Sequence, residues 1–161
     1  GVDRTPDMLG KVLKDAIAGD KPVREAAMFG VHGAHVNVTD GHYVYMRSGV
    51  ESNQPLNEYT LMPTHMRSHF SVKELQQIEL AEPFPFTKGC RTMKIHAEKF
   101  WGKHPDNKKT LLWDVKNDPK QTKPLNDPAI EKKMIDHLLR LMKECDAPAE
   151  QYERLGLVKK V

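Results

Sequence analysis

The sequence predicts an α+β fold: a small antiparallel β-sheet with a long C-terminal helix packed on it. Residues 35–46, HVNVTDGHYVYM, form two alternating segments joined by Asp40-Gly41, a residue pair that tight hairpin turns favour. Short β-type segments follow at 92–95 and 110–115. From Pro128 onward, apolar residues recur at helical spacing behind Asp127, a favourable N-cap. Short strands followed by one amphipathic helix indicate a two-layer α+β unit.

The first half of the chain supplies a short helix and three strands. Residues 8–17 have helical apolar spacing, stopped by Gly19-Asp20, and predict a surface helix. Residues 24–33, REAAMFGVHG, predict a strand that ends in glycines. In the hairpin, we expect one face to carry four apolar side chains and the other to carry both tyrosines. The four are Val36, Val38, Val44 and Met46, and the tyrosines are Tyr43 and Tyr45.

The middle of the chain alternates strands with turns. Residues 58–66 predict an edge strand, because Pro63 removes a backbone donor. Ser71 and Glu74 form a capping box, which predicts a helix over 72–80. Residues 81–89 contain two prolines in three positions and exclude regular structure.

The composition indicates a folded domain and argues against nucleic-acid or membrane binding. The 161 residues are enough for one domain with a core, and 39% hydrophobic with 29% charged residues is the balance of a folded protein. The net charge of +3 is spread along the chain, so we expect no nucleic-acid partner. No apolar run reaches the roughly 20 residues of a membrane helix, so we expect no membrane partner. Two distant cysteines do not indicate a disulfide framework or a zinc site.

The motifs that carry chemistry are absent from the sequence. It contains no G-x-S-x-G nucleophile elbow, no phosphate-binding glycine loop and no H-E-x-x-H metal motif. We therefore predict no catalytic residues and no metal ligands, although the eight histidines include pairs at close spacing. Any contribution to a reaction would come from rim residues of a site built elsewhere.

Three segments resemble one known family. REAAMFGVHGAHVNVTDGHYVYMR resembles the opening of the C-terminal subdomain of bacterial sulfatases, arylsulfatase-like members of the alkaline phosphatase superfamily. LLWDVKNDPKQTKPLNDPAIEKKMIDHLLRLM is similar to the strand, turn and helix that end the same family, and TPDMLGKVLKDAIAGDK is similar to the linker that precedes the subdomain. With the stretch between them, the resemblance covers essentially the whole chain.

The resemblance implies a non-catalytic fragment of a sulfatase-family hydrolase. Residues 1–25 would be the linker and short helix that leave the catalytic domain, and residues 26–161 the C-terminal α+β subdomain. The family's formylglycine, made within a C/S-x-P/A-x-R motif, and its calcium belong to the N-terminal catalytic domain. That motif is absent here, so we expect no cofactor in this chain. The first partner would be that catalytic domain, and through it a sulfated small molecule or sugar.

The resemblance also singles out a loop. The segment GVHGAH follows the first strand, and we expect it to face the substrate of the parent enzyme, with His32 and His35 donating hydrogen bonds to sugar hydroxyls or sulfate. Two alternatives stay open. In the first, the parent is a related phosphodiesterase or phosphonate hydrolase; in the second, the chain acts as a stand-alone binding or oligomerisation module. In the last case, the apolar stripe of the final helix and the tail YERLGLVKKV would form an interface between copies.

Overall fold

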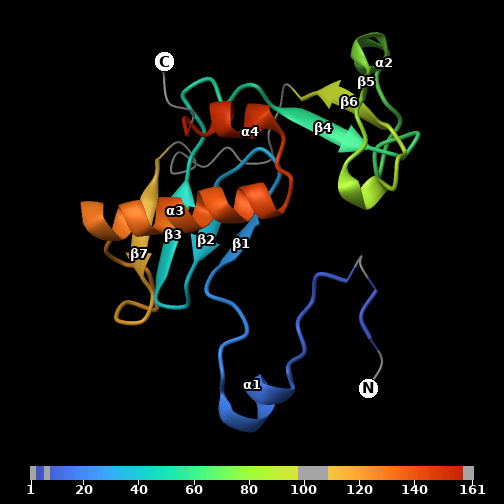
Figure 1. The fold of residues 1–161 in the computed structure, drawn as a ribbon. Helices are drawn as coiled ribbons and strands as arrows, with labels where there is room; N and C mark the ends of the chain where they lie inside the picture. The colour runs from blue at the N-terminus through green and yellow to red at the C-terminus, as the bar shows by residue number, and fades with distance from the viewer. Residues whose placement is uncertain (1–2, 6–7, 98–108, 158–161) are drawn as a thin grey trace.

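The computed structural model describes residues 3–5, 8–97 and 109–157, and it confirms the α+β class (Figure 1). A four-stranded antiparallel sheet has the order β1-β2-β3-β7, and a three-stranded antiparallel sheet has the order β4-β6-β5. The strands of the first sheet are β1 (Ala27–Gly30), β2 (Val36–Thr39), β3 (Tyr43–Arg47) and β7 (Leu111–Asp114). The strands of the second are β4 (Asn57–Thr60), β5 (Glu79–Ala81) and β6 (Thr92–His96). The chain thus forms two sheets where we expected one, because β7 takes the place beside β3 that the next strand in sequence, β4, would have taken.

The core lies between the first sheet and α3 (Pro128–Glu144), which crosses one face of that sheet (Figure 1). The predicted N-cap is confirmed, since the Asp127 carboxylate accepts hydrogen bonds from the backbone N–H of Ala129 and Ile130. Apolar side chains of the helix stripe pack on those of the central strands and on the C-terminal segment. The buried members of this cluster are Ala26, Val38, Tyr45, Leu112, Met134, Leu138, Met142 and Leu155.

The hairpin of β2 and β3 is confirmed, but the expected division of its faces is wrong. Val38 lies opposite Tyr45, and both are fully buried, whereas Asn37 lies opposite Met46. The loop consists of Gly41 and His42, and Gly41 has the positive φ of 87° that such a turn requires. A loop of two residues pairs even-numbered positions with odd-numbered ones. Tyr45 therefore lies on the same face as the valines of β2, the face toward α3. A loop with an odd number of residues would have placed Tyr45 on the opposite face from these valines.

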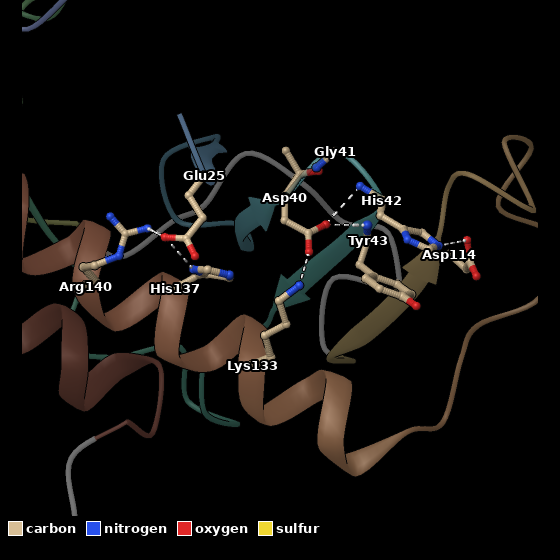
Figure 2. Close-up of polar contacts among 10 residues, drawn as sticks. Glu25, Asp40, Gly41, His42, Tyr43, Asp114, Lys133, His137 and Arg140 are labelled. Atoms are coloured by element: carbon tan, nitrogen blue, oxygen red, sulfur yellow. Dashed lines mark hydrogen bonds and ion pairs between the residues drawn. The ribbon is translucent and has the colours of Figure 1, made fainter. Parts of the chain in front are cut away.

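Asp40 ties this turn to α3 (Figure 2). Its Oδ1 accepts the backbone N–H of His42 and of Tyr43, and its Oδ2 lies 2.7 Å from the Lys133 Nζ. Next to it, the ring of His42 stacks on Tyr43, and its Nε2 lies 3.1 Å from Asp114 of β7. One carboxylate thus closes the turn and joins the sheet to the helix.

The titration of Asp40 gives a testable consequence. Burial alone would raise the pKa of this carboxyl, but the hydrogen bonds from Lys133, Tyr43 and His42 outweigh it and lower the pKa from 3.8 to about 2. Because the pKa is lower in the folded state than in the unfolded state, the carboxylate stabilises the fold above about pH 4, and this stabilisation is lost as the pH falls toward about 2. We expect the wild type to lose about 2 kcal/mol more stability over this interval than Asp40→Asn.

Urea unfolding of both proteins at about pH 5 and about pH 2 measures the difference. Asp136→Asn is the matched control, because Asp136 is an exposed carboxylate of α3 that pairs with Lys132 four residues away. Equal acid sensitivity of wild type and Asp40→Asn would contradict the prediction.

The predicted N-terminal helix at 8–17 is wrong in position. The helix α1 spans Lys14–Gly19, lies apart from both sheets in Figure 1, and contributes no buried side chain. Leu9, Val12 and Leu13 are exposed and precede it. Short helices depend on packing an apolar face, and without such packing the spacing alone does not hold residues 8–13 in a helix.

Five further segments differ in detail from expectation. The capping box of Ser71 and Glu74 is confirmed, but α2 spans Val72–Gln77 and the residues after it form the edge strand β5. The stretch expected to be irregular contains a short 3-10 helix, η1 (Pro85–Thr87). The predicted strands at 24–33 and 58–66 are confined to β1 and β4. The tail adds a helix that the sequence did not predict, α4 (Ala149–Arg154).

Candidate functional site

The loop between β1 and β2 carries both histidines that the sequence singled out. Gly30 ends β1 where a Cβ atom would lie 2.7 Å from the carbonyl oxygen of His35, so the chain can reverse here only at a glycine. Gly33 has a φ of 73°, again a conformation that favours glycine. The shape of the loop therefore depends on both glycines.

Arg154 of α4 stabilises this loop by hydrogen bonding. Arg154 is 2% exposed, and its guanidinium donates to the carbonyl of Ala34 at 3.3 Å and to the Oδ1 of Asn53 at 2.8 Å. Asn53 in turn donates from Nδ2 to the carbonyl of Gly33 at 2.9 Å. Burial lowers the pKa of Arg154, because a charged guanidinium removed from water loses its hydration. Two backbone carbonyls of the loop are therefore fixed by side chains from distant segments.

The structure gives His32 and His35 different surroundings. His35 is buried, and its Nε2 lies 2.7 Å from the carbonyl oxygen of Lys109, next to the start of β7. His32 is partly exposed, and its Nε2 lies 3.7 Å from the Oε1 of Glu58 on β4. The ring of His35 thus joins two backbone segments, whereas the ring of His32 faces solvent beside a carboxylate.

His32 is the first group in a row of alternating imidazoles and carboxylates. The other carboxylate oxygen of Glu58 lies 3.6 Å from the Nδ1 of His65, and the Nε2 of His65 lies 2.7 Å from Glu74. Glu74 also accepts the backbone N–H of Ser71 at 2.6 Å as part of the capping box. The row therefore connects the β1–β2 loop, the second sheet and the start of α2.

The carboxylate at the end of this row stays ionised over a wide pH range. The backbone N–H of Ser71, its side chain and His65 together lower the pKa of Glu74 from 4.5 to about 2. A permanent negative charge there favours an imidazole N–H that points toward it from His65.

Two surface hollows have Glu58 as a common lining residue. The smaller has a volume of 260 Å³ and lies beside α2, where Glu74 and His96 line it. The larger has a volume of 480 Å³, and His32, Tyr59, Phe84 and Phe86 line it together with residues that follow α3. Glu58 therefore presents its charge to both, and His32 stands at the rim of the larger hollow.

The arrangement suits binding through hydrogen bonds and ring contacts. Within the described ranges, no three His, Cys, Asp or Glu side chains converge as a metal site would require. Cys90 and Cys145 are free and exposed.

Sequence reasoning singled out His32 but missed the residues that position and accompany it. Glu58 and Phe86 lie in segments read only as a strand and an irregular stretch, and Arg154 lies in a tail without helical spacing. The second segment does contain a signal that could have been used: two phenylalanines flank Pro85, and rings so close in the chain can form an aromatic wall.

Comparisons with protein-family models, with curated proteins and with solved structures found no match to this chain. In the described part of the chain, every helix is too short or too polar to cross a membrane.

Proposed function

We propose that this chain is the non-catalytic C-terminal portion of a sulfatase-family hydrolase, in which it shapes and stabilises the substrate site of an N-terminal catalytic domain. Sulfuric ester hydrolysis would be the work of that domain, with its calcium and formylglycine. The observation that carries the proposal is the position of His32: the loop that we expect to face the substrate holds a partly exposed imidazole at the rim of a 480 Å³ hollow.

The loop has the rigidity that substrate positioning needs. Its carbonyls at Gly33 and Ala34 accept hydrogen bonds from Asn53 and Arg154, so the backbone on the C-terminal side of His32 is fixed. A side chain on a fixed backbone loses little additional freedom when it binds.

The surrounding charge indicates which part of a substrate His32 would contact. Glu58 lies 3.7 Å from the ring, and a carboxylate at that distance disfavours a sulfate group on the same spot. A hydroxyl group can instead accept from the imidazole and donate to the carboxylate. We therefore place the sugar or alcohol part of a sulfate ester at His32, and the sulfate itself on the catalytic domain.

Hydrolysis of an aryl sulfate tests the proposal. The natural polypeptide that contains these residues should turn over the aryl sulfate, and the 161-residue chain should not. In the larger protein, His32→Ala should raise KM for a sulfated sugar about fivefold, the loss of one hydrogen bond of about 1 kcal/mol, with little change in kcat. The exposed His69 provides the control variant, His69→Ala, which should leave both constants unchanged.

Two results would count against the proposal. Turnover of the aryl sulfate by the 161-residue chain would show that it carries its own catalytic groups. Turnover of an aryl phosphodiester but not an aryl sulfate by the larger protein would assign the parent to the related phosphodiesterases.

A second candidate function is a stand-alone oligomerisation module. The stripe of the final helix that we expected to form its interface is instead buried on the chain's own first sheet, so that part of the expectation is wrong. The observation that favours the module is the exposure of four large apolar side chains in and before α1, namely Leu9, Val12, Leu13 and Ile17. In the sulfatase proposal the catalytic domain covers them, and in this alternative a second copy of the chain does. Size-exclusion chromatography distinguishes the two: the alternative requires the natural polypeptide to form a dimer that Leu13→Glu dissociates.

A further inference from the structure

The larger hollow has one wall built from aromatic rings. Phe84 and Phe86 stack with their ring centroids 5.3 Å apart and their planes at 8°. Tyr59 of β4 meets Phe84 edge to face at 5.1 Å. Phe86 remains 70% exposed, so a ligand in the hollow can reach its ring. The face of an aromatic ring carries the negative end of its quadrupole, and an open face therefore attracts cations.

The same hollow carries negative charge from carboxylates. Glu58 and Asp146 line it, and no Lys or Arg is among its described lining residues. A third carboxylate, Glu150, lies behind the aromatic wall, where it accepts hydrogen bonds from the Tyr59 hydroxyl and, at 3.0 Å, from Asn57. The rings and the charges thus favour the same kind of ligand.

The contact between Tyr59 and Glu150 maintains this charge. Burial of Glu150 opposes its ionisation, but the hydrogen bonds from Tyr59 and Asn57 outweigh it and hold its pKa below the ordinary value. Burial and the neighbouring carboxylate raise the pKa of Tyr59 well above its ordinary value, so the hydroxyl keeps its proton and continues to donate. A phenol that donates to a carboxylate has a more electron-rich ring, which strengthens its attraction for a cation.

We propose that this hollow binds a small organic cation, a tertiary or quaternary ammonium compound, between the exposed ring of Phe86 and the carboxylates of Glu58 and Asp146. The volume of 480 Å³ lies within the range of small-ligand sites. Methyl groups on nitrogen can leave water and contact a ring, while the charge they carry is balanced by the carboxylates. A bare metal ion lacks such a surface, and an anion would be repelled.

The proposal does not rest on the proposed function, because binding is measured on this chain alone without any hydrolysis. The probe is choline chloride, and the matched compound is 3,3-dimethylbutan-1-ol, which has the same shape with carbon in place of the charged nitrogen. Both are titrated into the full 161-residue chain at constant ionic strength, with binding followed by NMR of the aromatic side chains. We expect saturable shifts with choline and at least about tenfold weaker binding of the neutral alcohol.

Three variants test the assignment to this hollow. Phe86→Leu keeps an apolar side chain but removes the ring, and should weaken choline binding by about tenfold. Glu58→Gln removes one charge and should weaken it severalfold. Phe29→Ala is the control: Phe29 is a half-exposed ring on β1, outside the lining of the hollow, and its removal should leave choline binding unchanged.

Three outcomes would overturn the proposal. The first is equal binding of choline and the neutral alcohol, which would mark the hollow as merely apolar. The second is no saturable binding of choline up to about 50 mM, which lies beyond the millimolar range of a weak specific site. The third is wild-type binding by Phe86→Leu, which would place any choline contact elsewhere. Phe86 is exposed, so its replacement is expected to leave the fold intact, as circular dichroism of the variant verifies.

Discussion

Replacing Arg154 with alanine is expected to lower the free energy of unfolding by about 3 kcal/mol, since three buried or half-buried acceptors lose their donor at about 1 kcal/mol each. The acceptors are the carbonyl of Ala34 and the side chains of Asn53 and Gln151. Arg154→Lys should recover only part of this loss, because one ammonium group cannot reproduce the planar fork that reaches all three. Urea unfolding measures both losses.

The same variants should loosen the loop that carries His32. Amide hydrogen exchange over residues 31–35 should become faster in Arg154→Ala than the loss of global stability accounts for, because the carbonyl of Ala34 then loses its hydrogen bond from the guanidinium. Arg140→Ala is the control, since Arg140 is an exposed residue of α3 that pairs with Glu25 and Glu144 and should cost about 0.5 kcal/mol. A loss below about 1 kcal/mol in Arg154→Ala would mean that the clamp does not support the loop.

Replacing Leu138 with alanine is expected to cost about 3 kcal/mol, and to lower Tm by about 10 °C, because the side chain is fully buried between α3 and the first sheet. The lost methyl groups leave a cavity beside a close-packed cluster that includes Val38 and Tyr45. Leu138→Met keeps most of the volume and should cost less than about 1.5 kcal/mol. Thermal and urea unfolding both measure the effect.

Leu75→Ala is the matched control for the core. Leu75 lies on α2 and is 57% exposed, so its truncation should change stability by no more than about 0.5 kcal/mol. If Leu138→Ala were as mild as Leu75→Ala, α3 would not pack on the sheet through this stripe.

The parts of the fold that the sequence predicts are those held by contacts close in the chain. The Asp127 cap, the Ser71–Glu74 capping box and the hairpin around Gly41 depend on hydrogen bonds between residues two to four positions apart. The apolar stripe of α3 can also be predicted from the sequence, because the residues that recur with 3.6-residue periodicity along its 17 residues are those that pack on the sheet. At α1 the same periodicity gave a helix that begins too early, because none of its described side chains is buried against another part of the described structure.

The candidate site could be predicted only in part. His32 stood out through its glycine-flanked loop, but its neighbour Glu58 lies 26 positions away in a strand of the other sheet. Phe84 and Phe86 reach the hollow from the segment before β6, and Asp146 reaches it from the end of α3. No local pattern encodes such convergence, because it depends on which strands pair and where the helix ends.

The sequence by itself determined the α+β class, the turn, the helix caps and the apolar stripe, since each is set by local hydrogen bonding or by side-chain periodicity. The tertiary structure alone decided the division into two sheets and the contact of Arg154 with the His32 loop. These features arise where β7 pairs with β3 across more than 60 residues of chain and α4 returns to the β1–β2 loop. The free energy of such contacts comes from groups that meet only after the chain has folded.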